Sequence, residues 1–220
     1  NKGPCERLDD VLHAEGLNID AIKLDTQGSE LFILQGAQQH LEDSIFAIES
    51  EVEFLELYEN QPLFRDIDGY LQARGYRLID CGNIAYIKGQ NSVGIGGEKG
   101  QMVAADALYF KSLEVIKKIL PEGDTQKLAR ILMTCLSYGY PDYALEICCE
   151  LKKSSHIREK FLNECIAILQ EIRPISNSIP KFPGRASLSR LLWHASNLLN
   201  QIDHVCWLNP LGSSTKYLKK

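Results

Sequence analysis

The chain has 220 residues, enough for one large domain or two small ones of roughly 100–200 residues each. Hydrophobic residues make up 45% of the chain and charged residues 24%, which is typical of a globular protein. The formal net charge of −5 gives no general electrostatic reason to bind nucleic acid or an anionic membrane. No uninterrupted apolar run approaches the ~20 residues that cross a bilayer. We therefore expect neither a nucleic-acid partner nor a membrane partner.

The cysteine pattern indicates reduced side chains. The seven cysteines are odd in number, include no C-x-x-C pair and mostly fall in apolar, helix-like patterns: Cys5, Cys81, Cys135, Cys148, Cys149, Cys165 and Cys206. Zinc sites usually show paired ligands at short spacing, so no metal site is expected. The chain also opens without a charged and then apolar leader. We expect small, reduced core cysteines in a cytoplasmic protein.

The first half of the chain alternates short apolar runs with amphipathic helices. The periodicity predicts helices at 8–15, 29–42 and 62–75, and strands at 21–25, 45–54, 76–80, 84–88 and 106–110. Cys81-Gly82-Asn83 suits a turn between two of these strands. The glycine-rich stretch 94–100 lacks G-x-G-x-x-G spacing, so it suits a hairpin loop better than a phosphate-binding loop. This order describes an α/β fold with a mainly parallel sheet and a terminal hairpin-like element, as in half of a doubly wound fold.

The second half of the chain is helical. Strand patterns stop after residue 112, and apolar periodicity predicts helices at 113–120, 125–138, 143–152, 157–172 and 187–202. Short polar or Gly/Pro segments separate these helices. We expect two domains, a sheet-containing domain at 1–112 and an all-α helical extension at 113–220.

One polar turn joins the strand at 21–25 to the next helix. Asp25 ends the strand, where ligands of open α/β sheets bind. Gly28 permits a backbone conformation or a close approach that a side chain would obstruct. Glu30 begins the helix, where the local dipole favours a carboxylate. These residues therefore suit a ligand site, and they equally suit a simple cap of the turn and helix.

A second acidic group lies on the strand at 45–54. Glu49, Glu51 and Glu53 stand at alternate positions and therefore point to one side of the strand. Four interpretations follow from this pattern: substrate binding, proton acceptance, a hard metal site, or a solvated edge. Metal coordination needs several converging oxygens, and one strand alone does not show convergence.

An ordered set of motifs resembles the FkbM-type, S-adenosylmethionine-dependent methyltransferases. The resemblance covers about the first 112 residues and rests on Leu8-Asp9-Asp10, Ile22-Lys23-Leu24-Asp25-Thr26-Gln27-Gly28-Ser29-Glu30, Leu34-x-Gly36-Ala37, Glu51-Val52, Leu57-Tyr58-Glu59-Asn60-Gln61-Pro62-Leu63-Phe64, Gly75-Tyr76-x-Leu78 and Asp106-Ala107-Leu108-Tyr109-Phe110. It implies the C-terminal half of a Rossmann-like class I methyltransferase sheet. It also implies methyl transfer from S-adenosylmethionine to a hydroxyl oxygen of a sugar, glycan or other small metabolite.

The resemblance implies roles for particular residues. Asp25, Glu30 and Glu51 are the expected catalytic residues, with Glu51 or Glu30 accepting the hydroxyl proton. Asp25, Gln27 and Gly28 are the expected cofactor-binding residues. Glu51 is preferred within the acidic strand because it falls where the family has its E-V pair.

The family's glycine-rich cofactor loop and its acidic ribose ligand precede the part that this chain resembles. Together with the first residue, Asn1, this favours a fragment whose parent protein is the active enzyme and which is inactive alone. The strand at 21–25 would then have an exposed edge, which favours self-association. The alternative is a non-catalytic interaction module, in which the helical-hairpin extension binds a protein partner. A genuine start codon close to Asn1 would favour that alternative.

Overall fold

The computed structural model of the chain describes residues 5–87, 100–154, 156–172, 187–188, 190–192 and 205–208. Helices and strands follow one another in the order α1 (Leu8–Ala14), β1 (Ala21–Leu24), α2 (Glu30–Gly36), α3 (Gln38–Asp43), β2 (Ala47–Glu53), α4 (Phe64–Gln72), β3 (Tyr76–Ile87), β4 (Gln101–Lys111), α5 (Ile116–Ile119), α6 (Thr125–Ser137), α7 (Pro141–Lys152), α8 (Glu159–Glu171) and β5 (Val205–Leu208). None of the helices in this part of the chain is long and apolar enough to span a membrane.

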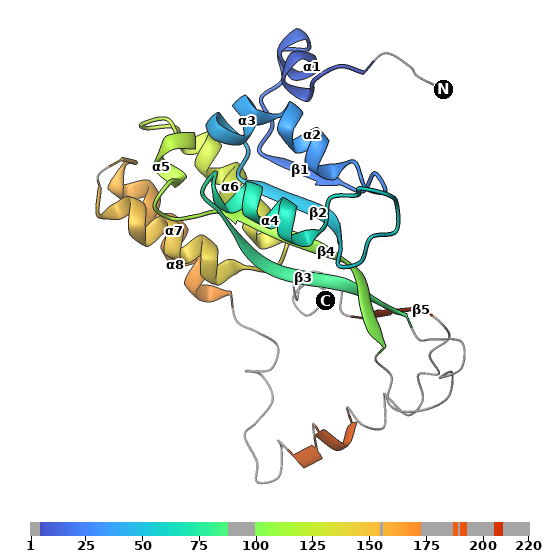
Figure 1. Cartoon of the computed structure of the whole chain (residues 1–220). Coiled ribbons are helices and arrows are strands. Elements are labelled where there is room, and N and C mark those ends of the chain that lie inside the picture. The colour runs from blue at the N-terminus through green and yellow to red at the C-terminus, as the bar shows by residue number, and fades with distance from the viewer. Residues whose placement is uncertain are drawn as a thin grey trace.

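The sheet has the strand order β1-β2-β4-β3-β5 (Figure 1). β1 and β2 are parallel, and β4 lies between β2 and β3 and is antiparallel to both. β1, β2 and β3 therefore share one direction, whereas β4 runs the opposite way. The expectation of an α/β fold is confirmed, but the expectation of a mainly parallel sheet is wrong for the described strands, where only β1 and β2 form a parallel pair. Sequence periodicity reports which residues are apolar and not which strand becomes the neighbour.

β3 differs from the hairpin expected around Cys81-Gly82-Asn83. It runs as one strand from Tyr76 to Ile87 along β4, with register shifts at Leu78/Asp80, Gly82/Ala85 and Ala85/Tyr86. Asn83 has φ 47°, so the irregularity is taken up inside the strand as bulging and not as a turn. β4 also begins at Gln101, five residues before the expected start. The predicted loop at 94–100 lies outside the described residues except for Gly100.

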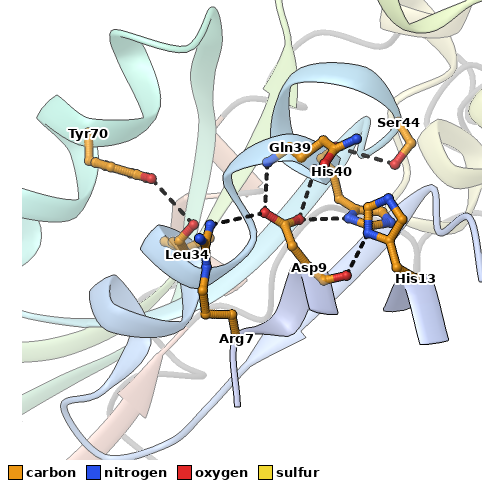
Figure 2. A network of polar contacts seen from close by, with 8 residues as sticks. All are labelled: Arg7, Asp9, His13, Leu34, Gln39, His40, Ser44 and Tyr70. Carbon is orange, nitrogen blue, oxygen red and sulfur yellow. Dashed lines mark hydrogen bonds and ion pairs between the residues drawn. The ribbon is translucent and has the colours of Figure 1, made fainter. Parts of the chain in front are cut away.

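The helix expected at 29–42 is broken at Ala37, where φ is −107°. The reason is a long-range contact: the buried Asp9 carboxylate accepts hydrogen bonds from the backbone N–H groups of Gln39, at 2.9 Å, and His40, at 3.1 Å (Figure 2). It also pairs with His40 Nδ1 at 2.7 Å. Asp9 of α1 therefore caps α3, as side chains commonly do at helix N-termini.

Two hydrophobic cores lie on the two faces of the sheet. One face packs on α2, α3 and α4 through a group that includes Leu34, Ile67, Ile48 and Val52. The other packs on the helices from α5 to α8, and Ala47, Leu108 and Phe110 belong to that group. Neighbouring residues of β2 and of β4 thus alternate between the cores, as expected of strands covered on both faces. Figure 1 shows the helices α5–α8, coloured green to orange, gathered beside the sheet.

The helices after β4 agree with the periodicity except at their ends. α5 is shorter than the expected helix at 113–120, and α7 begins at Pro141, a residue suited to the first turn of a helix. The helix expected at 187–202 is described only at 187–188 and 190–192, which are helical. The expectation of an all-α extension after residue 112 is wrong at β5, which pairs antiparallel with β3 and returns to the sheet. The boundary at residue 112 stays a prediction, and so does self-association through β1, which pairs with β2 at one edge of the sheet.

Candidate functional site

The candidate site lies where the parallel strands β1 and β2 end. Lys23 is opposite Glu49 and Leu24 is opposite Ser50. Asp25, the residue after β1, continues this register and comes beside Glu51 of β2. The structure therefore brings together two residues that the sequence places 26 positions apart, at the edge where open α/β sheets bind ligands.

The turn after β1 is built around the carboxylate of Glu30. This side chain, which is 1% exposed, accepts hydrogen bonds from Thr26 N at 2.6 Å, Thr26 Oγ1 at 2.9 Å and Gly28 N at 2.9 Å. Gln27 and Gly28 both have positive φ, at 58° and 103°. A non-glycine residue in this region is uncommon and is often found at functional sites. Glu30 therefore holds the turn and its oxygens are already engaged there.

The turn directs the Gln27 side chain between the two acids. Its Nε2 donates to Glu51 Oε2 at 2.9 Å and lies 3.4 Å from Asp25 Oδ1. The amide group therefore links the carboxylates without neutralising either. Asp25 and Gln27 are exposed, so this end of the pair is open to a ligand.

The environment makes Glu51 a weak acid. Burial, followed by the negative charges of Asp25 and Glu53, raises the pKa of Glu51 to about 7. Burial and the charge of Glu30 also raise the pKa of Glu53, which is 3% exposed. A carboxyl group with a pKa near 7 is suited to accept a proton at neutral pH. Perturbed groups of this kind gather at functional sites more often than elsewhere.

Gln61 is a residue of the site that the motif alone did not single out. A Cβ atom on Gly28 would lie 2.9 Å from Gln61 Nε2, so the turn and the Gln61 side chain are in close contact. Gln61 Oε1 accepts hydrogen bonds from the backbone of Leu57 and Tyr58. It therefore fixes the loop after β2 against the turn. Its place in the Leu57–Phe64 motif was the available signal.

The three glutamates of β2 have different partners. Glu49 contacts Lys23 and Tyr138, Glu51 contacts Gln27, and Glu53 is buried beside Gln61. Across the sheet from Glu51, Asp106 accepts a hydrogen bond from Asn83 Nδ2 at 2.5 Å. Within the described ranges, no three His, Cys, Asp or Glu side chains are placed to hold a metal ion.

One comparison with known proteins agrees with the motifs up to Leu78, whereas the motif at 106–110 lies beyond the matched segment. Residues 2–78 match the model of the methyltransferase FkbM domain. Neither the curated proteins nor the solved structures gave a match. The matched segment contains α1 to α4, the Thr26–Gly28 turn, Asp25 and Glu51. Residues 2–78 are thus similar to the FkbM methyltransferase domain.

Proposed function

We propose that the protein carrying this chain transfers a methyl group from S-adenosylmethionine to a hydroxyl oxygen of a sugar or another small metabolite. The Asp25–Glu51 pair carries this proposal, because it puts a proton acceptor beside a second carboxylate at a ligand-binding edge. The FkbM match over residues 2–78 supports the reaction class.

The direction of the strands supports the C-terminal half of a Rossmann-like sheet. β1, β2 and β3 share one direction, which gathers their carboxyl ends along one side of the sheet. Asp25 and Glu51 both stand on that side. Ligands of doubly wound sheets bind outside these strand ends.

The acidic character of the site fits the methyl donor. S-adenosylmethionine, when bound, supplies an electrophilic methyl group on a positively charged sulfur. Repulsion from Asp25 and Glu53 contributes to the raised pKa of Glu51, and a cation nearby would relieve this repulsion. Asp25 and Gln27 are exposed and would hold the donor, whereas Gly28 shapes the turn that presents Gln27.

Glu51, Gln27 and Glu30 have different roles in the proposed reaction. Glu51 takes the proton that the acceptor hydroxyl loses as its oxygen is methylated. Gln27 orients Glu51 through the hydrogen bond to Oε2. Glu30 is a positioning residue, because its carboxylate is occupied by the turn. Alignment of the acceptor oxygen with the methyl group supplies much of the rate in a displacement of this kind.

Transfer of labelled methyl groups from S-adenosylmethionine to a panel of sugar alcohols and methyl glycosides tests this function in the protein that carries the chain. Glu51→Gln should lower the rate by about 100-fold, the usual contribution of a general base. Asp25→Asn should lower the rate by weakening the hold on the methyl donor. Glu122→Gln, at an exposed loop position, is the matched control and should keep the full rate. Full activity in both site variants would overturn the assignment.

A further inference from the structure

Two pairs of facing residues at the β1–β2 edge differ in charge: one pair is acidic on both sides and the other joins a cation to an acid. Each pair is called a rung of the β1–β2 ladder. The upper rung is the acidic pair of Asp25 and Glu51. One step below it, Lys23 Nζ donates to Glu49 Oε1 at 2.6 Å. Asp25 follows β1 and comes two positions after Lys23, just as Glu51 comes two positions after Glu49 on β2. The four side chains therefore share a side of the ladder, and the ammonium lies next to an acidic pair with which it is not bonded.

Glu49 is held from a second direction by the helical region. The hydroxyl of Tyr138, the C-cap residue of α6, donates to Glu49 Oε2 at 2.7 Å. Burial and the adjacent Glu49 raise the pKa of Tyr138, so the hydroxyl keeps its proton and remains a donor. Both oxygens of Glu49 are thus occupied, and its side chain is only 13% exposed.

The Lys23 ammonium has freedom that Glu49 lacks. Its side chain is 55% exposed. The hydrogen bond to Glu49 raises the pKa of Lys23 most among the favourable contributions, and the charges of Asp106 and Asp25 add to the rise. The Lys23 ammonium is therefore attracted by the charge of Asp25 while it is paired with Glu49. If its pairing with Glu49 were weakened, it would turn toward the acidic pair.

We propose that Glu49 is a positioning residue for the site: clamped by Tyr138 of the helical region, it keeps the Lys23 ammonium on the lower rung and away from Asp25 and Glu51. The helical region thereby preserves an uncompensated acidic pair and a Glu51 that can take up a proton. The consequence for catalysis rests on the proposed function, but the charge arrangement itself does not.

Among the residues that the structure describes, the other groups that face Glu51 are acidic or neutral. They come from the turn after β1, from α2, from β2 itself and from the neighbouring β4: Asp25, Gln27, Glu30, Glu53 and Asp106. Movement of the Lys23 ammonium toward Asp25 would bring a positive charge close to the Glu51 carboxyl group. An opposite charge within about 4–6 Å lowers a carboxyl pKa by roughly 1–3 units.

Carboxyl ¹³C titration of Glu51 by NMR in the intact chain tests the proposal without methyl donor or acceptor. Glu49→Gln should lower the Glu51 pKa by about one unit. Removing the Glu49 charge also acts on Glu51 directly, so the same substitution is repeated in a Lys23→Met background. The direct effect persists there, whereas the effect of a moving ammonium is lost. The shift should therefore be clearly smaller in that background.

Two tyrosines at the same corner provide a matched comparison. Tyr138→Phe removes the clamp on Glu49 and should lower the Glu51 pKa in the same direction as Glu49→Gln, by less. Tyr140→Phe removes a similar hydrogen bond, from the Tyr140 hydroxyl to Asp80 Oδ2 at 2.7 Å. It should leave the pKa of Glu51 unchanged. If Tyr138 had a purely structural role, Tyr138→Phe and Tyr140→Phe would both lower stability, and neither would change the pKa of Glu51.

Three results would overturn the inference: an unchanged Glu51 titration in Glu49→Gln, an equal shift in the Lys23→Met background, or equal effects of the two tyrosine variants. Because the readout is a titration in the chain itself, it is independent of whether the protein transfers methyl groups. If these variants left the Glu51 pKa unchanged while the protein still transferred methyl groups, this inference would be rejected and the proposed function would stand.

Discussion

Lys127 of α6 reaches the sheet and forms an ion pair with Asp20, the residue immediately before β1. The Lys127 side chain is 4% exposed and its Nζ also donates to the carbonyl of Ser44 at 2.8 Å. Arg130, one helical turn later, binds the other oxygen of Asp20 from an exposed position. The helical region is therefore joined to the start of β1 by one buried and one exposed cation.

Loss of the buried cation should cost far more stability than loss of the exposed one. Lys127→Met leaves Asp20 with only its exposed partner, and we expect it to lower the free energy of unfolding by about 3 kcal/mol. Arg130→Met should cost under about 1 kcal/mol, as solvent-exposed pairs do. Urea denaturation of both variants measures the difference, and equal costs would contradict it.

Gly28→Ala should destabilise the turn for two reasons. Its φ of 103° is unfavourable for a side-chain-bearing residue, and the new Cβ would lie 2.9 Å from Gln61 Nε2. We expect a loss of about 2–3 kcal/mol in the free energy of unfolding. Gly123→Ala is the control, because Gly123 also has positive φ, at 78°, but faces open space. It should cost about 1 kcal/mol. Similar losses would show that the Gln61 contact is easily displaced.

Asp9→Asn should destabilise the chain in a pH-dependent way. Burial raises the pKa of Asp9, but hydrogen bonds from Gln39 and His40 outweigh it, and the net pKa is lowered. Stability from this ionised group is therefore present above its unfolded pKa of 3.8 and is lost as the pH falls through the lower folded value. At pH 7 we expect a cost of about 2 kcal/mol, typical of hydrogen bonds to charged groups. Denaturation at several pH values measures it.

Asp10→Asn is the control for Asp9→Asn, since Asp10 is exposed on the same turn of α1. It should leave the free energy of unfolding nearly unchanged. A cost for Asp9→Asn that stays constant down to low pH would mean that the amide loses packing and not charge-assisted hydrogen bonds.

Glu51→Gln should stabilise the chain at high pH. The folded pKa of about 7 lies above the ordinary value of 4.5, so the folded chain binds this proton more tightly than the unfolded chain does. The contribution to stability is fully present below the ordinary pKa and is lost as the pH rises to about 7. Because solvent screens the partly exposed group, we expect a gain of only about 1 kcal/mol for the variant at pH 8.

The measurement for Glu51→Gln is the difference in melting behaviour between variant and wild type at pH 5 and pH 8. The difference should grow with pH. The same comparison for Glu122→Gln should show no trend. A variant less stable than wild type at pH 8 would indicate that the ionised Glu51 contributes favourable contacts.

Local chemistry was enough to predict the turn that carries the site. A strand end, a glycine and a glutamate at the helix start indicated Asp25, Gly28 and Glu30, and the structure places all three at one turn. The pairing of Asp25 with Glu51 depends on more than local chemistry, because β1 and β2 must be parallel neighbours in the register that sets Lys23 opposite Glu49. The sequence did not show whether Glu30 is catalytic or caps the turn. In the structure, both of its oxygens accept hydrogen bonds from the turn itself.

Contacts over long sequence separations account for what could not be predicted. Tyr138 binds Glu49 from 89 positions away, and Asp9 caps a helix 31 positions away. The break at Ala37 depends on that cap, so apolar periodicity alone read one continuous helix. The expected hairpin at Cys81 failed for a similar reason, because pairing with β4 keeps β3 continuous through the bulge.

The pH dependence of kcat/KM for methyl transfer by the protein that carries this chain tests the central claim most directly. If Glu51 accepts the proton, kcat/KM rises with pH through a midpoint near 7, the pKa that burial and the neighbouring acids give this group. Glu51→Gln should then lose the rise together with about 100-fold in rate. A midpoint that stays near 7 in the variant, or a wild-type profile that is flat through neutral pH, would contradict the account.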